Sequence, residues 1–224
     1  MKYNPLDTVK EIYRLYDAQL KTANMACRKY CADCCTTNVT MTRLEGLLIT
    51  DVVSEKQISG RLSKNACDAL PRYQPRLSTN TYIERCRSGE DPDDDQPGAQ
   101  SGICPFLESG ACTIYPVRPF GCRCMISKTT CSQNGYAEID EVTLTMNTVF
   151  LQFIEHIDQK GFSGNMIDVL TCLTAKPDAI SPDAISKDCR IIANRPISVL
   201  MVPPDQQREM QEIVTSLARL AERL

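Results

Sequence analysis

The chain has 224 residues, of which 25 are Lys or Arg and 28 are Asp or Glu, so its net charge is −3. This length suits one domain with its own core, and the charge balance excludes a strongly basic surface for nucleic acid or anionic membranes. No apolar run approaches the roughly 20 residues that span a bilayer, and the charged start is unlike a signal peptide. We therefore expect a cytoplasmic protein without a nucleic-acid or membrane partner.

The first predicted element is an amphipathic helix that leads toward a group of cysteines. Asn4 suits an N-cap, and Pro5 suits the first helical position, where its missing N–H has no consequence. Apolar residues then recur at three- and four-residue steps, and the pattern continues toward Cys27. At about 100° per residue, the four cysteines from Cys27 to Cys35 fall on one helical face. We expect their thiols to converge on one point, or to flank it if the helix ends near Cys34.

The next segments predict two more helices and a long irregular stretch. Thr42 and Glu45 form a capping box, which indicates that a helix begins there. A third helix is expected over 54–70, and residues 71–103 are expected to be irregular with at most one short helix. The aspartates in 91–95 resemble the start of a calcium loop, but the turn glycine and the bidentate glutamate are missing, so a surface loop is the better interpretation.

After the second group of cysteines, the sequence again predicts helices. An apolar stripe indicates a helix over 139–160, a shorter one is expected over 163–174, and an amphipathic helix is expected over 205–224. Residues 197–202 have the pattern of a strand. The tandem repeat in 177–186 is too short for a solenoid and is interpreted as two turns with caps.

Together these patterns predict a single, mostly α-helical domain over 1–224. Its helices are expected to be irregularly arranged, with long loops organised around a cysteine-ligated metal site. The cysteine-cluster region would cover 27–125, and a helical C-terminal part would cover 139–224.

Cysteine usage is the unusual feature of the composition, with 13 cysteines against one histidine. An odd number cannot pair completely and the expected compartment is reducing, so a disulfide framework is disfavoured. Eight cysteines gather in two short segments, and these are the candidate metal ligands: Cys27, Cys31, Cys34, Cys35, Cys104, Cys112, Cys122 and Cys124. Five others carry no such pattern and are expected to be buried small hydrophobic residues: Cys67, Cys86, Cys131, Cys172 and Cys189.

A site built only from thiolates selects zinc, iron–sulfur clusters or Cu(I). His156 lies within an apolar helix and is interpreted as a packing or surface residue. The C-x3-C-x2-C spacing and the proline after Cys104 favour an iron–sulfur cluster, of the [4Fe–4S] type, with zinc as the alternative. Cationic neighbours would compensate thiolate charge, because they outnumber Asp33 and Glu108: Arg28, Lys29, Arg118 and Arg123.

These residues resemble a known family, the zinc- or iron-chelating cysteine-cluster domain with a CxxCxxCC-like motif. The first matching block is Cys27-x3-Cys31-x2-Cys34-Cys35, followed by a helix that carries Glu45. The second block is long and specific: Cys104-Pro-Phe-Leu-Glu-Ser-Gly-Ala-Cys112-Thr-Ile-Tyr115-Pro-Val-Arg118-Pro-Phe-Gly-Cys122-Arg123. The match covers a little under half of the chain and does not require Cys124.

The resemblance implies a metal site and leaves the substrate open. Within the motif, Pro105 and Pro119 would stiffen the backbone beside ligands, and Arg118 and Arg123 would donate to cluster sulfurs or to cysteine carbonyls. Phe106 and Tyr115 would exclude water or belong to the core. Flagellin lysine-N-methylases look like relatives that carry a similar cluster.

Three functions are compatible with this sequence. The first is an iron–sulfur protein for electron transfer or redox sensing, with a protein redox partner or substrate. The second is a zinc-stabilised structural or binding module, in which metal binding supplies folding energy. The third is a cluster-dependent enzyme related to the flagellin lysine-N-methylases; the spacing from Cys27 to Cys34 also coincides with that of radical enzymes that cleave S-adenosylmethionine. Neither a Ser/His/Asp set nor a phosphate-binding glycine loop is present.

Overall fold

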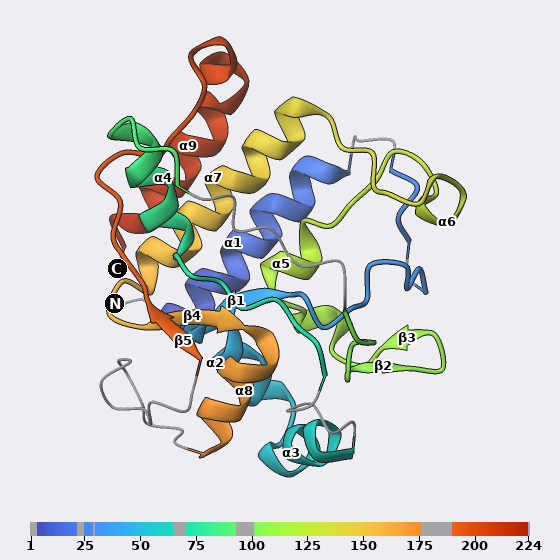
Figure 1. Ribbon diagram of the computed structural model, residues 1–224. Helices are drawn as coiled ribbons and strands as arrows, with labels where there is room; N and C mark the ends of the chain where they lie inside the picture. Colours follow the sequence, from blue (N-terminus) through green and yellow to red (C-terminus); the bar gives the residue numbers. More distant parts are fainter. Residues whose placement is uncertain are drawn as a thin grey trace.

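Helices provide most of the regular structure, as the sequence predicted, and two small antiparallel sheets lie among them (Figure 1). The computed structural model describes residues 4–21, 25–28, 30–64, 70–92, 101–175 and 190–223. Three sequence-based interpretations fall wholly or partly outside these residues. They concern the surface loop at 91–95, the repeat at 177–186, and the cysteines Cys67 and Cys189.

The first helix, α1 (Pro5–Leu20), begins as predicted, because the Asn4 side chain accepts a hydrogen bond from the Leu6 amide at 3.1 Å. It ends at Leu20 and does not continue into the cysteine motif. The prediction of a helical cysteine face is therefore wrong for the described residues of that loop. Tyr30 shows why, since its φ of 76° is incompatible with a right-handed helix.

The second helix, α2 (Arg43–Val52), has the predicted capping box. The Thr42 hydroxyl accepts from the Glu45 amide, and a Glu45 carboxylate oxygen accepts from the Thr42 amide at 2.8 Å. The third helix, α3 (Glu55–Lys64), lies within the predicted 54–70; residues 65–69 of that prediction lie outside the described residues, and Leu70 is not helical. The short helix expected within 71–103 is α4 (Thr79–Arg87).

A three-stranded antiparallel sheet crosses the middle of the molecule in the order β1–β4–β5 (Figure 1). Its strands are β1 (Thr40–Thr42), β4 (Phe162–Asn165) and β5 (Ile191–Ala193). The sequence did not predict this sheet. Because 162–165 form a strand, the helix expected over 163–174 begins later, as α8 (Met166–Ala175). The strand predicted at 197–202 is wrong, since those residues form no strand.

The first of two hydrophobic cores lies among α1, α2, α7 (Glu141–Ile157) and α9 (Gln207–Ala221). Both α7 and α9 confirm predicted helices, and the turn η4 (Pro204–Gln206) precedes α9. The Tyr16 ring meets the Phe120 and Phe150 rings edge-on, with centroids 4.7 and 5.2 Å apart. His156 was predicted to be a packing or surface residue. It lies on α7, and its Nδ1 accepts a hydrogen bond from the Ile197 amide at 3.1 Å.

The second core lies among α2, α3 and α8 and extends into the second cysteine segment. Phe106 and Ile114 are buried in it, so Phe106 is a core residue. Several predicted ligand cysteines pack against the same core, which places the candidate site on a rigid support. Within the described part of the chain, no helix combines the length and the apolar character needed to cross a bilayer.

Candidate metal centre

The first cysteine segment is a loop of tight turns, which runs from residue 25 to residue 39 beside the second segment. The Cys31 amide donates to the Arg28 carbonyl at 3.0 Å, and the Cys35 amide donates to the Ala32 carbonyl at 3.0 Å. Hydrogen bonds of this kind close turns of four residues, so the chain reverses repeatedly without a continuous helix.

Main-chain hydrogen bonds join the two cysteine segments directly. The Cys104 amide donates to the Cys35 carbonyl at 3.1 Å, and Thr36 forms an isolated bridge with Ile103. The Thr37 amide also donates to the Gly102 carbonyl at 3.0 Å. The backbone alone therefore holds Cys35 next to Cys104.

A hairpin and a short helix present the next two cysteines. Cys112 lies on β3 (Ala111–Cys112), opposite Leu107 of β2 (Leu107–Glu108), and Gly110 in the turn has a positive φ. The turn η2 (Tyr115–Val117) leads to α5 (Phe120–Arg123), which carries Cys122.

The helix α5 comes unusually close to β1 at Gly121. A Cβ atom at this position would lie 2.7 Å from the Thr40 carbonyl oxygen, closer than side chains approach a backbone. Only glycine fits here without a shift, so this position fixes where the neighbouring Cys122 lies.

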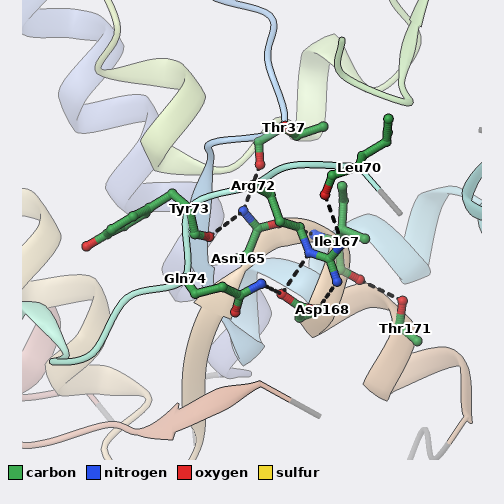
Figure 2. Close-up of polar contacts among 9 residues, drawn as sticks. All are labelled: Thr37, Leu70, Arg72, Tyr73, Gln74, Asn165, Ile167, Asp168 and Thr171. Carbon is green, nitrogen blue, oxygen red and sulfur yellow. Dashed lines mark hydrogen bonds and ion pairs between the residues drawn. The ribbon is translucent and has the colours of Figure 1, made fainter. Parts of the chain in front are cut away.

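A network of polar side chains anchors the loop that follows Cys35 (Figure 2). The Asn165 side-chain amide donates to the Thr37 carbonyl at 2.7 Å and to the Tyr73 carbonyl at 3.0 Å. Its oxygen accepts from the Ile167 amide at 3.0 Å, which connects the segments of Thr37 and Tyr73 to the start of α8. One buried amide therefore positions the loop, the 70–74 segment and the helix relative to one another.

The same network includes a buried ion pair between Arg72 and Asp168 (Figure 2). Two guanidinium nitrogens donate to the two carboxylate oxygens at 3.2 and 2.7 Å, and Gln74 donates to the carboxylate at 2.7 Å. The Arg72 and Asp168 side chains are only 7% and 9% exposed. Paired, bidentate and buried, these charges hold the 70–74 segment against α8.

Seven of the eight predicted ligands line one cavity of about 350 Å³, which we call the cysteine pocket. Its cysteines are Cys27, Cys31, Cys34, Cys35, Cys104, Cys112 and Cys122. The eighth, Cys124, is not among the lining residues, and its Sγ donates to the Gly121 carbonyl at 3.6 Å. Cysteines of both segments therefore line one cavity, although the first segment is a loop and not a helical face.

The thiols of the pocket do not surround one common point. Among the described residues, no group of three or more His, Cys, Asp or Glu side chains could hold a metal ion as it stands.

Several thiols of the pocket have raised pKa values. Burial raises the pKa of Cys122 and of Cys112, and a hydrogen bond from the Cys34 thiol to Cys35 raises the pKa of Cys34 while lowering that of Cys35. A metal ion would have to displace these protons.

The pocket is cationic apart from its thiols. Among its described lining residues are Arg28, Arg118 and Arg123, and none is an Asp or Glu. The Arg118 guanidinium stacks 3.9 Å from the centre of the Tyr115 ring, and its Nη1 donates to the Tyr115 carbonyl. Tyr115 therefore lines the pocket and orients Arg118.

One buried donor of Arg123 has no partner within the part of the chain that the structure describes. Its Nη1 donates to both Asp17 oxygens at 3.0 and 2.8 Å, and its Nη2 donates to the Pro116 carbonyl at 3.1 Å. The residue is 5% exposed, yet its Nε has no hydrogen-bond acceptor among the described residues. A buried donor without an acceptor is costly, which makes it informative beside a pocket of sulfur atoms.

A second cavity, of about 360 Å³, lies beside β1, α4 and α7 and has two buried carboxylates in its lining. Both are engaged in holding the fold. Glu45 accepts from the Tyr13 hydroxyl at 2.8 Å and from the Phe120 amide at 2.6 Å, and Glu155 accepts from the amides of Asn80 and Arg195. Glu45, which the motif singled out, is thus a structural link among α1, α2 and α5.

The remaining described cysteines differ in their surroundings. Cys172 is buried, as predicted, whereas Cys86 and Cys131 are half-buried. Cys131 begins α6 (Cys131–Asn134), and the Ser132 amide next to it donates to the Asp33 carboxylate of the first cysteine loop at 3.1 Å. The sequence reasoning missed this proximity, because Cys131 lies outside both motif blocks.

Comparison of the chain with protein-family models, curated proteins and solved structures finds no match in any of the three. The resemblance to the cysteine-cluster family therefore stays a prediction that depends on the motif residues.

Proposed function

We propose that the cysteine pocket binds an iron–sulfur cluster of the [4Fe–4S] type and that the protein transfers electrons or senses redox state through it. The convergence of seven cysteines from two distant segments on one cavity is the observation that carries this proposal. Thiolates are soft ligands, and a pocket with seven of them favours iron–sulfur clusters or zinc over hard cations. When bound, such a cluster supplies a site that takes up and releases one electron.

The residues around the thiols fit an anionic sulfur-rich group. Arg28, Arg118 and Arg123 would offset its negative charge. The Arg123 Nε, which has no acceptor among the described residues, would gain one in a sulfur atom of the group or of a coordinating thiolate. Hydrogen bonds to sulfur are one of the means by which proteins set reduction potential.

The mouth of the pocket suits contact with a protein redox partner. Cys31 is exposed there, and two large apolar residues of the lining reach solvent, Tyr30 at 68% and Met125 at 43% exposure. Exposed apolar side chains that gather at a functional opening are typical of a docking surface.

Zinc is the second candidate, and the irregular backbone of both cysteine segments favours it. Loops with little secondary structure gain the most from being joined by a structural metal. In that case the protein would be a zinc-stabilised binding module without redox activity.

Anaerobic purification followed by iron, sulfide and zinc analysis tests the proposal. We expect brown protein with broad visible absorbance that bleaches on reduction, together with iron and acid-labile sulfide in matched amounts. Substituting both Cys104 and Cys122 by Ser should remove the colour, whereas Cys86→Ser, outside the pocket, should keep it. Colourless anaerobic protein with stoichiometric zinc would contradict the iron–sulfur assignment and favour the zinc module.

A further inference from the structure

Arg123 is a buried cation of the cysteine pocket, and several contacts fix its position. It follows Cys122 at the end of α5, and its side chain is 5% exposed. Its guanidinium carbon lies 4.3 Å from the centre of the buried Tyr13 ring, and the Tyr13 hydroxyl donates in turn to Glu45 at 2.8 Å. The ring therefore holds the guanidinium in one place beside the pocket.

Asp17 is the counter-charge of Arg123, and it lies outside the lining of the pocket. It belongs to α1, which runs beside α5 (Figure 1). Both Asp17 carboxylate oxygens accept from the Arg123 Nη1, and the Asp17 side chain is 48% exposed. Within the part of the chain that the structure describes, Arg123 is the one arginine of the lining that pairs with a carboxylate. Asp17 is thus placed to offset part of the positive charge that Arg123 brings to the pocket.

The Nε of Arg123 is the donor that these contacts leave unused. Nη1 donates to Asp17 and Nη2 donates to the Pro116 carbonyl at 3.1 Å, but Nε has no acceptor among the described residues. Arg123 lines the pocket, whereas Asp17 and Pro116 are not in the described lining. A sulfur-rich group in the pocket would therefore find a buried donor that is already held in position.

The charges of this pair bear on how readily a group in the pocket accepts an electron. One-electron reduction adds one negative charge to an iron–sulfur cluster, so a nearby positive charge or a hydrogen bond to sulfur favours the reduced form. A nearby negative charge favours the oxidised form for the same reason. Arg123 and Asp17 should therefore shift the reduction potential in opposite directions. The larger shift belongs to Arg123, because it is buried and lines the pocket.

We propose that the Arg123–Asp17 pair sets the reduction potential of the cluster in the cysteine pocket, with Arg123 raising the potential and Asp17 limiting that rise. This inference rests on the proposed function and deepens it, because it assigns control of the potential to two residues that are not ligands. Arg123 acts on the cluster through its charge and its Nε donor. Asp17 is a positioning residue, since its carboxylate orients the guanidinium and offsets its charge.

Potentiometric titration of the anaerobically loaded, full-length protein tests the proposal, with dithionite as the electron donor and visible absorbance as the readout. We expect Arg123→Gln to make one-electron reduction about tenfold less favourable, which lowers the potential by about 59 mV. Asp17→Asn should raise the potential by a smaller amount, because an amide oxygen can still accept from Nη1 but carries no charge. A purely structural role of the pair would not produce shifts of opposite sign.

Glu11 and Arg14 supply matched control variants on the same helix as Asp17. Their ion pair is 2.9 Å long and exposed, and neither residue is in the described lining of the pocket. Because salt screens exposed charges, Glu11→Gln and Arg14→Gln should leave the potential unchanged. Equal shifts in these controls, or shifts of the same sign in Arg123→Gln and Asp17→Asn, overturn the proposal.

Asp17→Asn decides the question alone if Arg123→Gln fails to fold or loads no cluster. An unchanged or lowered potential in loaded Asp17→Asn then overturns the proposal. Failure of the proposed function looks different, because the wild type itself would load no iron and sulfide, and this inference would fall with it. A loaded wild type whose potential is the same as that of both variants overturns the inference and leaves the proposed function in place.

Discussion

Single carboxylates at buried positions connect elements that are far apart in the sequence. Asp158, at the end of α7, accepts from the Leu44 amide in the first turn of α2 and from the Asn194 side chain, both at 3.1 Å. Arg43 lies 3.6 Å away, and the side chain of Asp158 is 4% exposed. The Asp158 carboxylate satisfies an amide in the first turn of α2, where a negative charge is favourable. Its burial, however, disfavours the ionised form of the carboxylate.

Burial raises the pKa of Asp158 to about 7, from 3.8 for the free side chain, while the Leu44 amide and Arg43 oppose the shift and the nearby Glu45 charge adds to it. Between these values the folded protein holds a proton that the unfolded chain has released. The stability that this proton adds is complete below the lower value and is lost as pH rises through about 7. The pH dependence of unfolding should therefore contain a contribution from Asp158.

We expect Asp158→Asn to remove that contribution. Between about pH 5 and pH 7, the free energy of unfolding of the wild type should fall relative to the variant by up to about 1.4 kcal/mol per pH unit. Urea denaturation at a series of pH values measures this slope, and Asp51→Asn, an exposed position on α2, serves as the control. Parallel curves for the wild type and Asp158→Asn would contradict the prediction.

At the scale of elements, the buried network of Figure 2 holds the loop after Cys35 and the 70–74 segment on α8. Neither segment has regular structure of its own, so side-chain hydrogen bonds replace the ladder that a sheet would provide. The Arg72–Asp168 pair is the charged part of this network.

Asp168→Asn should destabilise the fold, because it leaves the Arg72 guanidinium buried without its counter-charge. Breaking one partner of a buried pair costs about 3 kcal/mol or more. Glu90→Gln is the matched control, since its pair with Arg85 is 3.8 Å long and exposed, and should change stability by less than about 1 kcal/mol. Equal losses in both variants, measured by chemical denaturation, would show that burial of the Arg72–Asp168 pair is unimportant.

The elements that the sequence predicted well are those whose signals are local. Two helix starts are marked by a few neighbouring residues, Asn4 with Pro5 and Thr42 with Glu45, and the structure confirms both. The strands of the central sheet have three or four residues, too few for an alternating pattern, and they pair over long distances. Their positions depend on partners that no local window contains.

The candidate site was predictable in composition but only partly in geometry. Clustering in the sequence identified eight candidate ligands, and seven of them line the pocket. The helical arrangement of the first segment failed because spacings that suit a helix also suit successive turns, and the left-handed Tyr30 marks the difference. The proximity of Cys131 depends on contacts of Ser127 and Ser132 with the loop, which sequence spacing cannot reveal.

For the whole molecule, the division into two hydrophobic cores separates the site from much of the scaffold. The core formed by α1, α7 and α9 contains none of the seven pocket cysteines, whereas several of them pack on the core around α8. Local stability should therefore respond unevenly to a bound metal.

Removing the metal from loaded protein should loosen the cysteine segments selectively. Hydrogen exchange is expected to rise by about tenfold or more in 25–37 and 101–131, whose backbone has few regular hydrogen bonds, while α7 and α9 keep their protection. Mass spectrometry of chelator-treated and untreated protein compares the two states. An even rise across all helices would mean instead that metal binding and global folding are one transition.

The hydrogen bond between the Cys104 amide and the Cys35 carbonyl also bears on the order of events during synthesis. A growing chain that has emerged only as far as Cys35 carries the first thiols without their partners in the second segment. Closing so long a loop costs conformational entropy, and only packing of the surrounding hydrophobic cores can offset that cost. Binding of a metal by Cys35, Cys104 and their neighbours would therefore follow folding, at a cavity whose lining includes Tyr30 and Met125.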